Sequence, residues 1–325
     1  MSHAIVIHEL GGPEKLSFET VADAEPAAGQ VRIQQTAIGL NFVDVYYRTG
    51  LYKVPGLPFV PGQEGAGIVE AVGPGVSDVA IGDRVAYGGV NGGAYAERRL
   101  IAADRLVRLP SGVDDRTAAA MMLKGMTAEF LLHRCARVVR GDTILFHAAA
   151  GGVGSIACQW ARAIGIKVIG TAGGLDKVAR ARQNGCDEVI DMHEEDVASR
   201  VKEITSGAGV RVVFDSVGKA TFDASLSCLA PRGMMVLFGQ SSGVVPPLDL
   251  ARLAAGGSLF VTRPLLNQYI ATREELVQSA GRLFDVVGRG AVRIPIGQTY
   301  ALRDAAQAHR DLEGRKTTGS TVLLP

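Results

Sequence analysis

The spacing of hydrophobic residues changes near residue 122. Before that point, short apolar runs are separated by glycine- and proline-rich turns, which predicts a β-rich domain with few helices. The strands expected in this part are 4–8, 31–37, 67–72 and 84–86.

Beyond residue 122, short apolar runs alternate with segments of helical periodicity. The predicted strands are 143–147, 167–172, 188–190, 211–215, 234–238 and 258–262. Helices are expected from residue 155 onward and over 176–184, 194–205 and 220–229. This alternation is typical of the α/β class with a doubly wound parallel sheet.

The tail adds a predicted helix over 274–287 and a strand over 320–324. Because the tail returns to β patterning, we expect it to pack back on the first domain. The predicted domains are therefore 1–122, completed by 264–325, and 123–263.

The turn over 148–154 joins the first α/β strand to its helix and consists of small residues. Read against G-x-G-x-x-G, it has Ala149 in the first position, followed by Gly151 and Gly154. Glycines let backbone N–H groups approach a pyrophosphate at a helix N-terminus, so Gly151, Gly152, Val153 and Gly154 are candidate dinucleotide contacts. The alternative is a tight turn between two buried elements.

The end of the second α/β strand indicates which dinucleotide binds. NAD enzymes of this fold carry a carboxylate there for the ribose hydroxyl, whereas this chain has Thr171, Ala172, Gly173 and Gly174. Lys177 follows in the next helix, where a bound phosphate would offset the unfavourable helix dipole. The pattern favours NADPH; the alternative is an exposed lysine whose small penalty is tolerated.

Composition narrows the class of partner. The 325 residues carry a net charge of +1 and contain no dense basic block, so nucleic acid and anionic membranes are not expected as main partners. We expect no signal peptide and no membrane span. The four cysteines are scattered, which indicates free thiols in a reducing compartment and hence a cytoplasmic protein.

Two further segments carry polar groups among apolar ones. Asn41, Asp44, Tyr46 and Tyr52 lie in the first, and residues 61–69 form a glycine-rich turn that enters a strand. The first segment, together with the motifs at 148–154, 214–218, 238–243 and 258–263, resembles the zinc-independent quinone oxidoreductases of the zeta-crystallin type, in the medium-chain dehydrogenase/reductase superfamily. The resemblance covers essentially the whole chain.

The resemblance implies a GroES-like β domain, a Rossmann domain, and hydride transfer from NADPH to a quinone in a cleft between them. It also implies a homodimer formed through the edge of the Rossmann sheet, for which 258–262 is the candidate strand. The implied cofactor contacts, besides the glycine turn and Lys177, are Phe42, Asp44, Thr127, Gly173, Gly174, Ser216, Val217, Phe238, Gly239, Gln240, Ser241, Arg263 and Leu265. Arg315, near the tail, is a second candidate cation for the cofactor phosphate, after Lys177. Met192 stands where bacterial relatives often carry a tyrosine.

The resemblance also bears on metal binding. Asn41 stands where the zinc enzymes of this superfamily have a cysteine ligand, and Gly62-Gln63-Glu64 replaces their Gly-His-Glu turn. A catalytic zinc site needs three suitable protein ligands, so we expect no metal. His147 is the last residue of a predicted buried strand and is expected to be a satisfied core histidine.

Without a Lewis acid, side chains must orient the acceptor, and Asn41, Tyr46 and Tyr52 are the candidates. A phenol or an amide can donate to a quinone oxygen as charge develops on it. The alternative is that the two tyrosines only pack at a domain edge. Two other functions stay open: reduction of activated C=C bonds in enones or alkenals, and a structural or regulatory role for a protein that binds NADPH without turnover.

Overall fold

The computed structural model describes residues 1–325 and divides the chain into two compact units. Unit 1 comprises Met1–Met126, Ile270–Gly288 and Ile294–Pro325. Unit 2 comprises Thr127–Tyr269 and Arg289–Arg293. No helix in either unit is both long enough and apolar enough to cross a bilayer.

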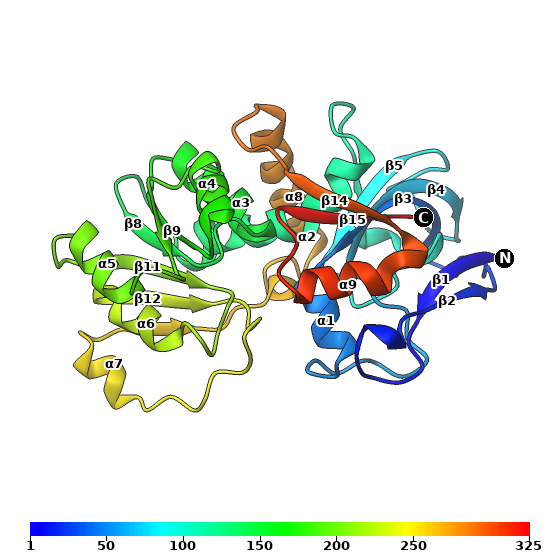
Figure 1. The fold of residues 1–325 in the computed structure, drawn as a ribbon. Helices are drawn as coiled ribbons and strands as arrows, with labels where there is room; N and C mark the ends of the chain where they lie inside the picture. Colours follow the sequence, from blue (N-terminus) through cyan, green and yellow to red (C-terminus); the bar gives the residue numbers. More distant parts are fainter. The chain divides into compact units, whose positions relative to one another are not determined.

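Unit 2 is built on one sheet in which every pair of neighbouring strands is parallel. In order across the sheet, they are β10 (Glu188–Asp191), β9 (Lys167–Ala172), β8 (Thr143–Phe146), β11 (Val210–Asp215), β12 (Leu229–Leu237) and β13 (Phe260–Thr262). The helices are α3 (Gly152–Ala163), α4 (Leu175–Gln183), α5 (Val197–Ile204), α6 (Phe222–Ser227) and α7 (Ala251–Ala255). Figure 1 shows α3 and α4 on one side of the sheet and α5 and α6 on the other. The doubly wound α/β prediction is therefore confirmed.

The strand order places a topological switch point at β8. The chain moves from β8 outward through β9 and β10, then returns to the other side of β8 with β11. Ligands of doubly wound sheets bind beyond the carboxyl ends of the strands at this point. The predicted glycine turn follows β8 directly, and β13 forms the sheet edge, where strand 258–262 was expected.

Several predicted boundaries in unit 2 were wrong, and two of these differences have identifiable reasons. Helix α5 begins at Val197 rather than at residue 194, because the Asp196 carboxylate accepts the Ser199 N–H at 2.8 Å and caps the helix there. Strand β13 begins at Phe260 rather than at residue 258, because Ser258 has a left-handed backbone with φ 61°.

Unit 1 contains a second, mostly antiparallel sheet and a two-stranded ribbon of β1 (Ser2–Val6) and β2 (Ser17–Val21). In order across the larger sheet, the strands are β14 (Ile296–Ala301), β15 (Ser320–Leu324), β3 (Gln30–Leu40), β4 (Glu64–Val72), β5 (Arg84–Gly88) and β7 (Val107–Arg108), while β6 (Arg98–Ala102) also pairs with β3. The helices are α1 (Phe42–Arg48), α2 (Asp115–Glu129), α8 (Arg273–Gly288) and α9 (Ala305–Glu313). The last residues of α2, from Thr127, belong to unit 2, where the helix continues as a π-helix over Phe130–Cys135.

The C-terminal strand closes this sheet onto its longest strand. Thr321, Val322 and Leu323 of β15 pair antiparallel with residues 38–40 of β3. Figure 1 shows the red C-terminal strand and the orange β14 running beside the blue β3. The strand predicted over 320–324 is confirmed, whereas α1, β2 and β6 were not predicted.

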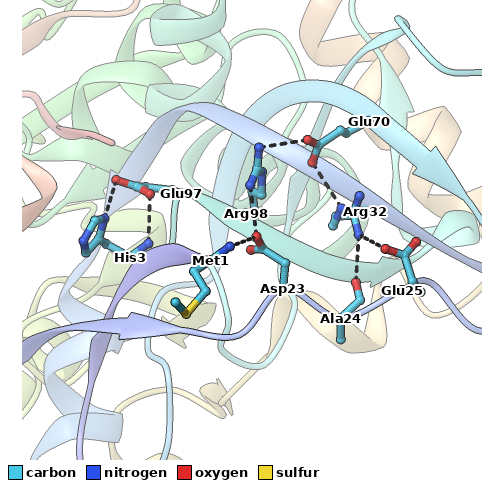
Figure 2. Close-up of polar contacts among 9 residues, drawn as sticks. All are labelled: Met1, His3, Asp23, Ala24, Glu25, Arg32, Glu70, Glu97 and Arg98. Atoms are coloured by element: carbon cyan, nitrogen blue, oxygen red, sulfur yellow. Dashed lines mark hydrogen bonds and ion pairs between the residues drawn. The ribbon is translucent and has the colours of Figure 1, made fainter.

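Ion pairs connect the ends of the N-terminal ribbon to the larger sheet (Figure 2). Arg98 pairs with Asp23 and with Glu70, each at 3.0 Å, and Arg32 pairs with Glu70 at 3.1 Å and Glu25 at 2.8 Å. Asp23 also accepts the N-terminal ammonium at 2.6 Å, and that hydrogen bond is the largest cause of lowering the pKa of Asp23 to about 2.

Candidate functional site

The acceptor-binding candidates of unit 1 gather where β3 ends and α1 begins. Asn41 separates the two elements, with an extended backbone at φ −135°. Its N–H donates to the Asp44 carboxylate at 2.8 Å, and its side-chain Nδ2 donates to Glu64 Oε1 at 2.8 Å. The Asn41 amide is therefore held by a carboxylate.

Glu64 is fully buried at the start of β4 and is satisfied from three directions. Besides Asn41, it accepts the backbone N–H of Leu123 at 2.6 Å and pairs with the Lys124 ammonium. Gly39 lies opposite Glu64 in the sheet register, and a Cβ atom there would approach Ala119 O to 2.2 Å, so only glycine fits. Sequence reasoning missed the Glu64–Lys124 pair, because only folding brings these positions together.

The fold brings together Tyr46 and Tyr52, two of the predicted acceptor-orienting residues. Their ring centroids lie 5.1 Å apart at an interplanar angle of 60°, and the Tyr52 N–H donates to the Tyr46 carbonyl at 3.0 Å. Tyr46 is mostly buried on α1, with the Phe42 ring at 5.7 Å. The ring of Tyr52 also contacts Tyr47, at 5.6 Å. The result is an edge-packed aromatic cluster that carries phenol hydroxyls.

Asp44, a predicted cofactor contact, is fully buried behind these groups. Its Oδ2 accepts the Asn41 N–H and the Tyr95 hydroxyl, at 2.8 and 3.1 Å, whereas its buried Oδ1 has no hydrogen-bond partner. Burial raises the pKa of Asp44 to about 7 against the opposing effect of these two bonds. Gln63, beside Glu64, likewise has a buried side-chain nitrogen without a partner.

No group of three or more His, Cys, Asp and Glu side chains is placed to hold a metal ion. At the position of the zinc-enzyme cysteine, the structure has the Asn41 amide bonded to Glu64.

In unit 2, the glycine turn has the geometry of a phosphate cradle. Gly152, Val153 and Gly154 form the first turn of α3, where backbone N–H groups have no intrahelical acceptor. A Cβ atom at Gly154 would approach Ala148 O to 2.4 Å, so the close start of the helix against the turn needs glycine. These residues fit a pyrophosphate.

Behind the turn, His147 is a satisfied core histidine, as expected. It is fully buried, with Nδ1 at 3.0 Å from Thr171 Oγ1 and Nε2 at 3.0 Å from Ser225 Oγ. Because Ser225 donates its own proton to Asp215 at 2.7 Å, His147 donates from Nε2 and accepts at Nδ1. Burial lowers the pKa of His147, so the ring stays neutral.

Two predicted cofactor segments lie side by side at the carboxyl ends of β11 and β12. Ser241 N–H donates to Ser216 O at 3.2 Å, and Ser242 N–H donates to Val217 O at 2.8 Å. A Cβ atom at Gly239 would approach Ser216 O to 2.6 Å, so the close contact depends on that glycine. The structure therefore brings together Ser216, Val217, Phe238, Gly239, Gln240 and Ser241.

At the end of β9, the structure adds groups that sequence reasoning missed. Asp191, from the neighbouring strand β10, accepts the N–H groups of Gly174 and His193 at 2.9 and 3.0 Å, and these bonds lower its pKa. The His193 imidazole lies against Gly173, where a Cβ atom would approach Nε2 to 2.7 Å. A carboxylate therefore does reach this strand end, although none lies within 171–174.

The remaining predicted contacts are dispersed. Lys177 lies in the first turn of α4, and Arg263 donates to Leu237 O, at the end of β12, at 3.0 Å. Thr127 and the exposed Leu265 also belong to unit 2, whereas Arg315 belongs to unit 1.

Two family models match the chain. The model described as "Alcohol dehydrogenase GroES-like domain" matches residues 27–111, and the model described as "Zinc-binding dehydrogenase" matches residues 152–279. The first lies within unit 1, and most of the second lies within unit 2.

Full-length relatives are more specific. A quinone oxidoreductase from Pseudomonas aeruginosa is 51% identical over 325 residues, covering all of both chains. The 2-haloacrylate reductase of a Burkholderia species is 46% identical, covering all of this chain and 99% of its own. The crystal structure of Escherichia coli quinone oxidoreductase complexed with NADPH matches with a TM-score of 0.98 at 46% identity, covering 99% of this chain and all of that one. This chain therefore belongs to the quinone oxidoreductase family of the medium-chain dehydrogenase/reductase superfamily.

Proposed function

We propose that this protein is an NADPH-dependent reductase of quinones. The observation that carries the proposal is the similarity over the whole chain, at 46–51% identity, to proteins named quinone oxidoreductase, one of which was solved with NADPH. The phosphate cradle at the switch point of unit 2 supports the cofactor part.

In this proposal, unit 2 holds the dinucleotide. The N–H groups of Gly152, Val153 and Gly154 bind the pyrophosphate, and Lys177 binds the ribose phosphate. The other unit 2 residues assigned to the cofactor are Thr127, Gly151, Gly173, Gly174, Ser216, Val217, Phe238, Gly239, Gln240, Ser241, Arg263 and Leu265. NADPH, when bound, supplies the hydride.

Unit 1 residues orient the acceptor. The phenols of Tyr46 and Tyr52 donate to a quinone oxygen as it gains negative charge, and their packed rings offer an apolar wall to a planar ligand. The Asn41 amide, fixed by Glu64, is the third orienting group. Phe42 and Arg315 complete the proposed cofactor contacts, whereas the fully buried Asp44 acts indirectly, by accepting the Asn41 N–H. The proton that completes the hydroquinone comes from water.

Cofactor choice is tested by titrating NADPH and NADH into the wild type and Lys177→Ala. We expect the wild type to bind NADPH more tightly than NADH. The affinity of the variant for NADPH should fall about tenfold, with little change in its affinity for NADH, because one charge-assisted hydrogen bond is removed. Lys167→Ala, an exposed lysine at the amino end of β9, is the matched control. Equal affinity of the wild type for both nucleotides contradicts the cofactor proposal, while an unchanged Lys177→Ala contradicts only the role of this lysine.

A second candidate function is reduction of activated C=C bonds, which the 2-haloacrylate reductase relative favours. Turnover of a panel of quinones is compared with that of enones, alkenals and 2-haloacrylate under the same NADPH concentration. We expect quinones to have the higher kcat/KM. A large advantage for the C=C acceptors would replace the quinone assignment, and NADPH binding without turnover of any acceptor would favour a regulatory role.

We further propose that the functional domains are 1–122 with 264–325 and 123–263, and that two copies associate through the β13 edge. Phe260 is exposed on this three-residue edge strand, as is Leu265 just beyond it, which supports pairing with a second copy. The four free cysteines support a reducing compartment such as the cytoplasm.

A further inference from the structure

Helix α1, which carries Tyr46, is held at both ends by one buried set of polar side chains. At its start, Asp44 accepts the N–H of Asn41. At its end, the almost fully buried Arg48 pairs with Glu313 of α9 through two hydrogen bonds of 2.6 and 3.1 Å. The same guanidinium contacts His309 Nδ1 at 3.1 Å. Both ends of a seven-residue helix are thus tied to distant parts of unit 1.

The two ends are connected through His309 and Tyr95, and the connection has one direction. Arginine can only donate, so His309 Nδ1 must accept and its Nε2 must carry the proton. That Nε2 lies 3.1 Å from the Tyr95 hydroxyl and donates to its oxygen. The Tyr95 hydrogen is then directed to Asp44 Oδ2, at 3.1 Å. Arg48, His309 and Tyr95 form what we call the donor chain to Asp44.

The donor chain cannot conduct a proton away from Asp44. His309 would have to accept a proton at a nitrogen that already carries one or at the nitrogen facing Arg48. Burial and the neighbouring guanidinium lower the pKa of His309 to about 3, so the ring stays neutral. Because Asp44 Oδ2 already receives two donors, a proton on Asp44 must sit on Oδ1, the oxygen without a partner.

Other charged groups act on Asp44 from the elements around it. Glu64 on β4 disfavours the ionised form, and Lys124 on α2 favours it. Burial is the largest effect and, with these groups, brings the pKa of Asp44 to about 7. Asp44 therefore changes protonation near neutral pH, whereas His309 does not.

We propose that Asp44 is a positioning residue for the reductase reaction: its carboxylate, oriented by the donor chain, holds the start of α1 and thereby Asn41 and Tyr46 in the arrangement that orients the acceptor. Protonation at Oδ1 removes the charge that strengthens the two hydrogen bonds to Oδ2 and so loosens that arrangement. The inference rests on the proposed function for its effect on turnover. The geometry of the donor chain does not depend on the proposed function.

The experiment measures kcat and KM for a quinone against pH, and in parallel the carboxyl ¹³C shift of Asp44 in ¹³C-aspartate-labelled protein, assigned by its absence in Asp44→Asn. We expect the wild-type kcat to rise with pH with a midpoint near 7, matching the NMR titration. Asp44→Asn should abolish this midpoint. Tyr95→Phe removes one donor to the carboxylate, so both midpoints should move upward by about one pH unit.

Two variants separate a fixed donor chain from general disturbance of the fold. His309→Gln keeps an acceptor for Arg48 and a donor for Tyr95, so we expect the wild-type midpoint. Tyr300→Phe removes a phenol hydrogen bond to Asp311, which lies on α9 like His309 but is not part of the donor chain. This variant should also leave the midpoint unchanged. An upward shift in Tyr95→Phe that the two controls lack supports the proposal.

The proposal is overturned if Tyr95→Phe keeps both wild-type midpoints, or if His309→Gln shifts them as far as Tyr95→Phe does, since the histidine would then act by transferring a proton. If the NMR midpoint shifts as expected but the pH midpoint of kcat does not shift with it, Asp44 is not a positioning residue for the reaction. If the wild type reduces no quinone, the proposed function fails, and the NMR titration alone still tests the donor chain.

Discussion

Each unit contains a fully buried aspartate that is linked through a hydroxyl group to a buried neutral histidine. In unit 2, Asp215 is linked through Ser225 to His147, and in unit 1, Asp44 is linked through Tyr95 to His309. The difference lies in the number of donors. Asp215 accepts four hydrogen bonds, two on each oxygen, whereas Asp44 accepts two on one oxygen and none on the other.

The origin of the donors explains this difference. Asp215 ends β11, and the turn after it supplies the N–H groups of Val217 and Gly218 at 2.8 and 3.0 Å. Thr221, just before α6, and Ser225 of α6 each supply a hydroxyl at 2.7 Å. Donors no more than 10 residues away in the sequence thus saturate this carboxylate. Asp44 instead depends on Tyr95 for its only side-chain donor. The comparison suggests that Asp215 fixes a loop, while Asp44 responds to its surroundings.

The largest expected effect comes from removing the cation near Asp44. Lys124→Met leaves Glu64 buried without its counter-charge and should lower the free energy of unfolding by about 4 kcal/mol, since breaking a buried pair typically costs 3–5 kcal/mol. It should also raise the Asp44 midpoint further, because Lys124 favours the ionised form. Urea denaturation measures the first effect, with the exposed Lys167→Met as control. A loss no larger than in that control would contradict the importance of the pair.

Substituting asparagine for Asp215 or for Asp44 gives the most direct comparison of the two carboxyl groups. Asp215→Asn places an NH₂ group among donors and should cost about 3 kcal/mol, because buried N–H or O–H groups lose their acceptor. Asp44→Asn can keep its carbonyl oxygen toward Asn41 and Tyr95 and should cost less than about 1 kcal/mol at pH 7. The same urea experiment measures both variants. Equal losses would show that donor count does not distinguish the two carboxyl groups.

The pH dependence of stability isolates Asp44. Its folded-state pKa of about 7 lies above the ordinary value, so the folded state binds the proton more tightly than the unfolded state does. The stabilisation is therefore complete below the ordinary pKa and is lost as pH rises toward about 7. Between pH 5 and 8, the wild type should lose about 2.5 kcal/mol relative to Asp44→Asn. Parallel curves for the two proteins would contradict the raised pKa.

The smallest effect is expected at the surface network of unit 1 (Figure 2). Glu70→Gln removes the carboxylate shared by Arg32 and Arg98, and partly solvent-exposed pairs contribute at most about 1 kcal/mol each. The loss should shrink when salt is added, because screening weakens such pairs. A salt-independent loss as large as that of Asp215→Asn would show that burial is not the feature that separates these sites.

Sequence alone predicted unit 2 more completely than unit 1. Strands buried on both faces appear as continuous apolar runs, and β9 was predicted with its observed bounds, Lys167–Ala172. In unit 1, β2 alternates between half-buried and exposed residues, so its hydrophobic pattern was too weak for the strand to be predicted. Helix α1 has only seven residues, Phe42–Arg48, so helical periodicity had too few positions to be detected.

The candidate site divides in the same way. The glycine turn after β8 and the loops after β11 and β12 could be predicted, because each is a local pattern next to a recognisable strand. Lys124, Tyr95 and His309 carried no local signal. They reach Glu64 and Asp44 across sequence separations of 60 residues for Lys124 and Glu64, and 51 for Tyr95 and Asp44.

The amino-acid sequence by itself determined the α/β class, the phosphate turn and the family, because backbone conformation and periodic burial are encoded by neighbouring residues. Only the tertiary structure decided which buried carboxyl group is saturated with donors and which keeps an unpaired oxygen. A side chain's protonation depends on the groups around it in space, and folding brings those groups from distant segments of the chain.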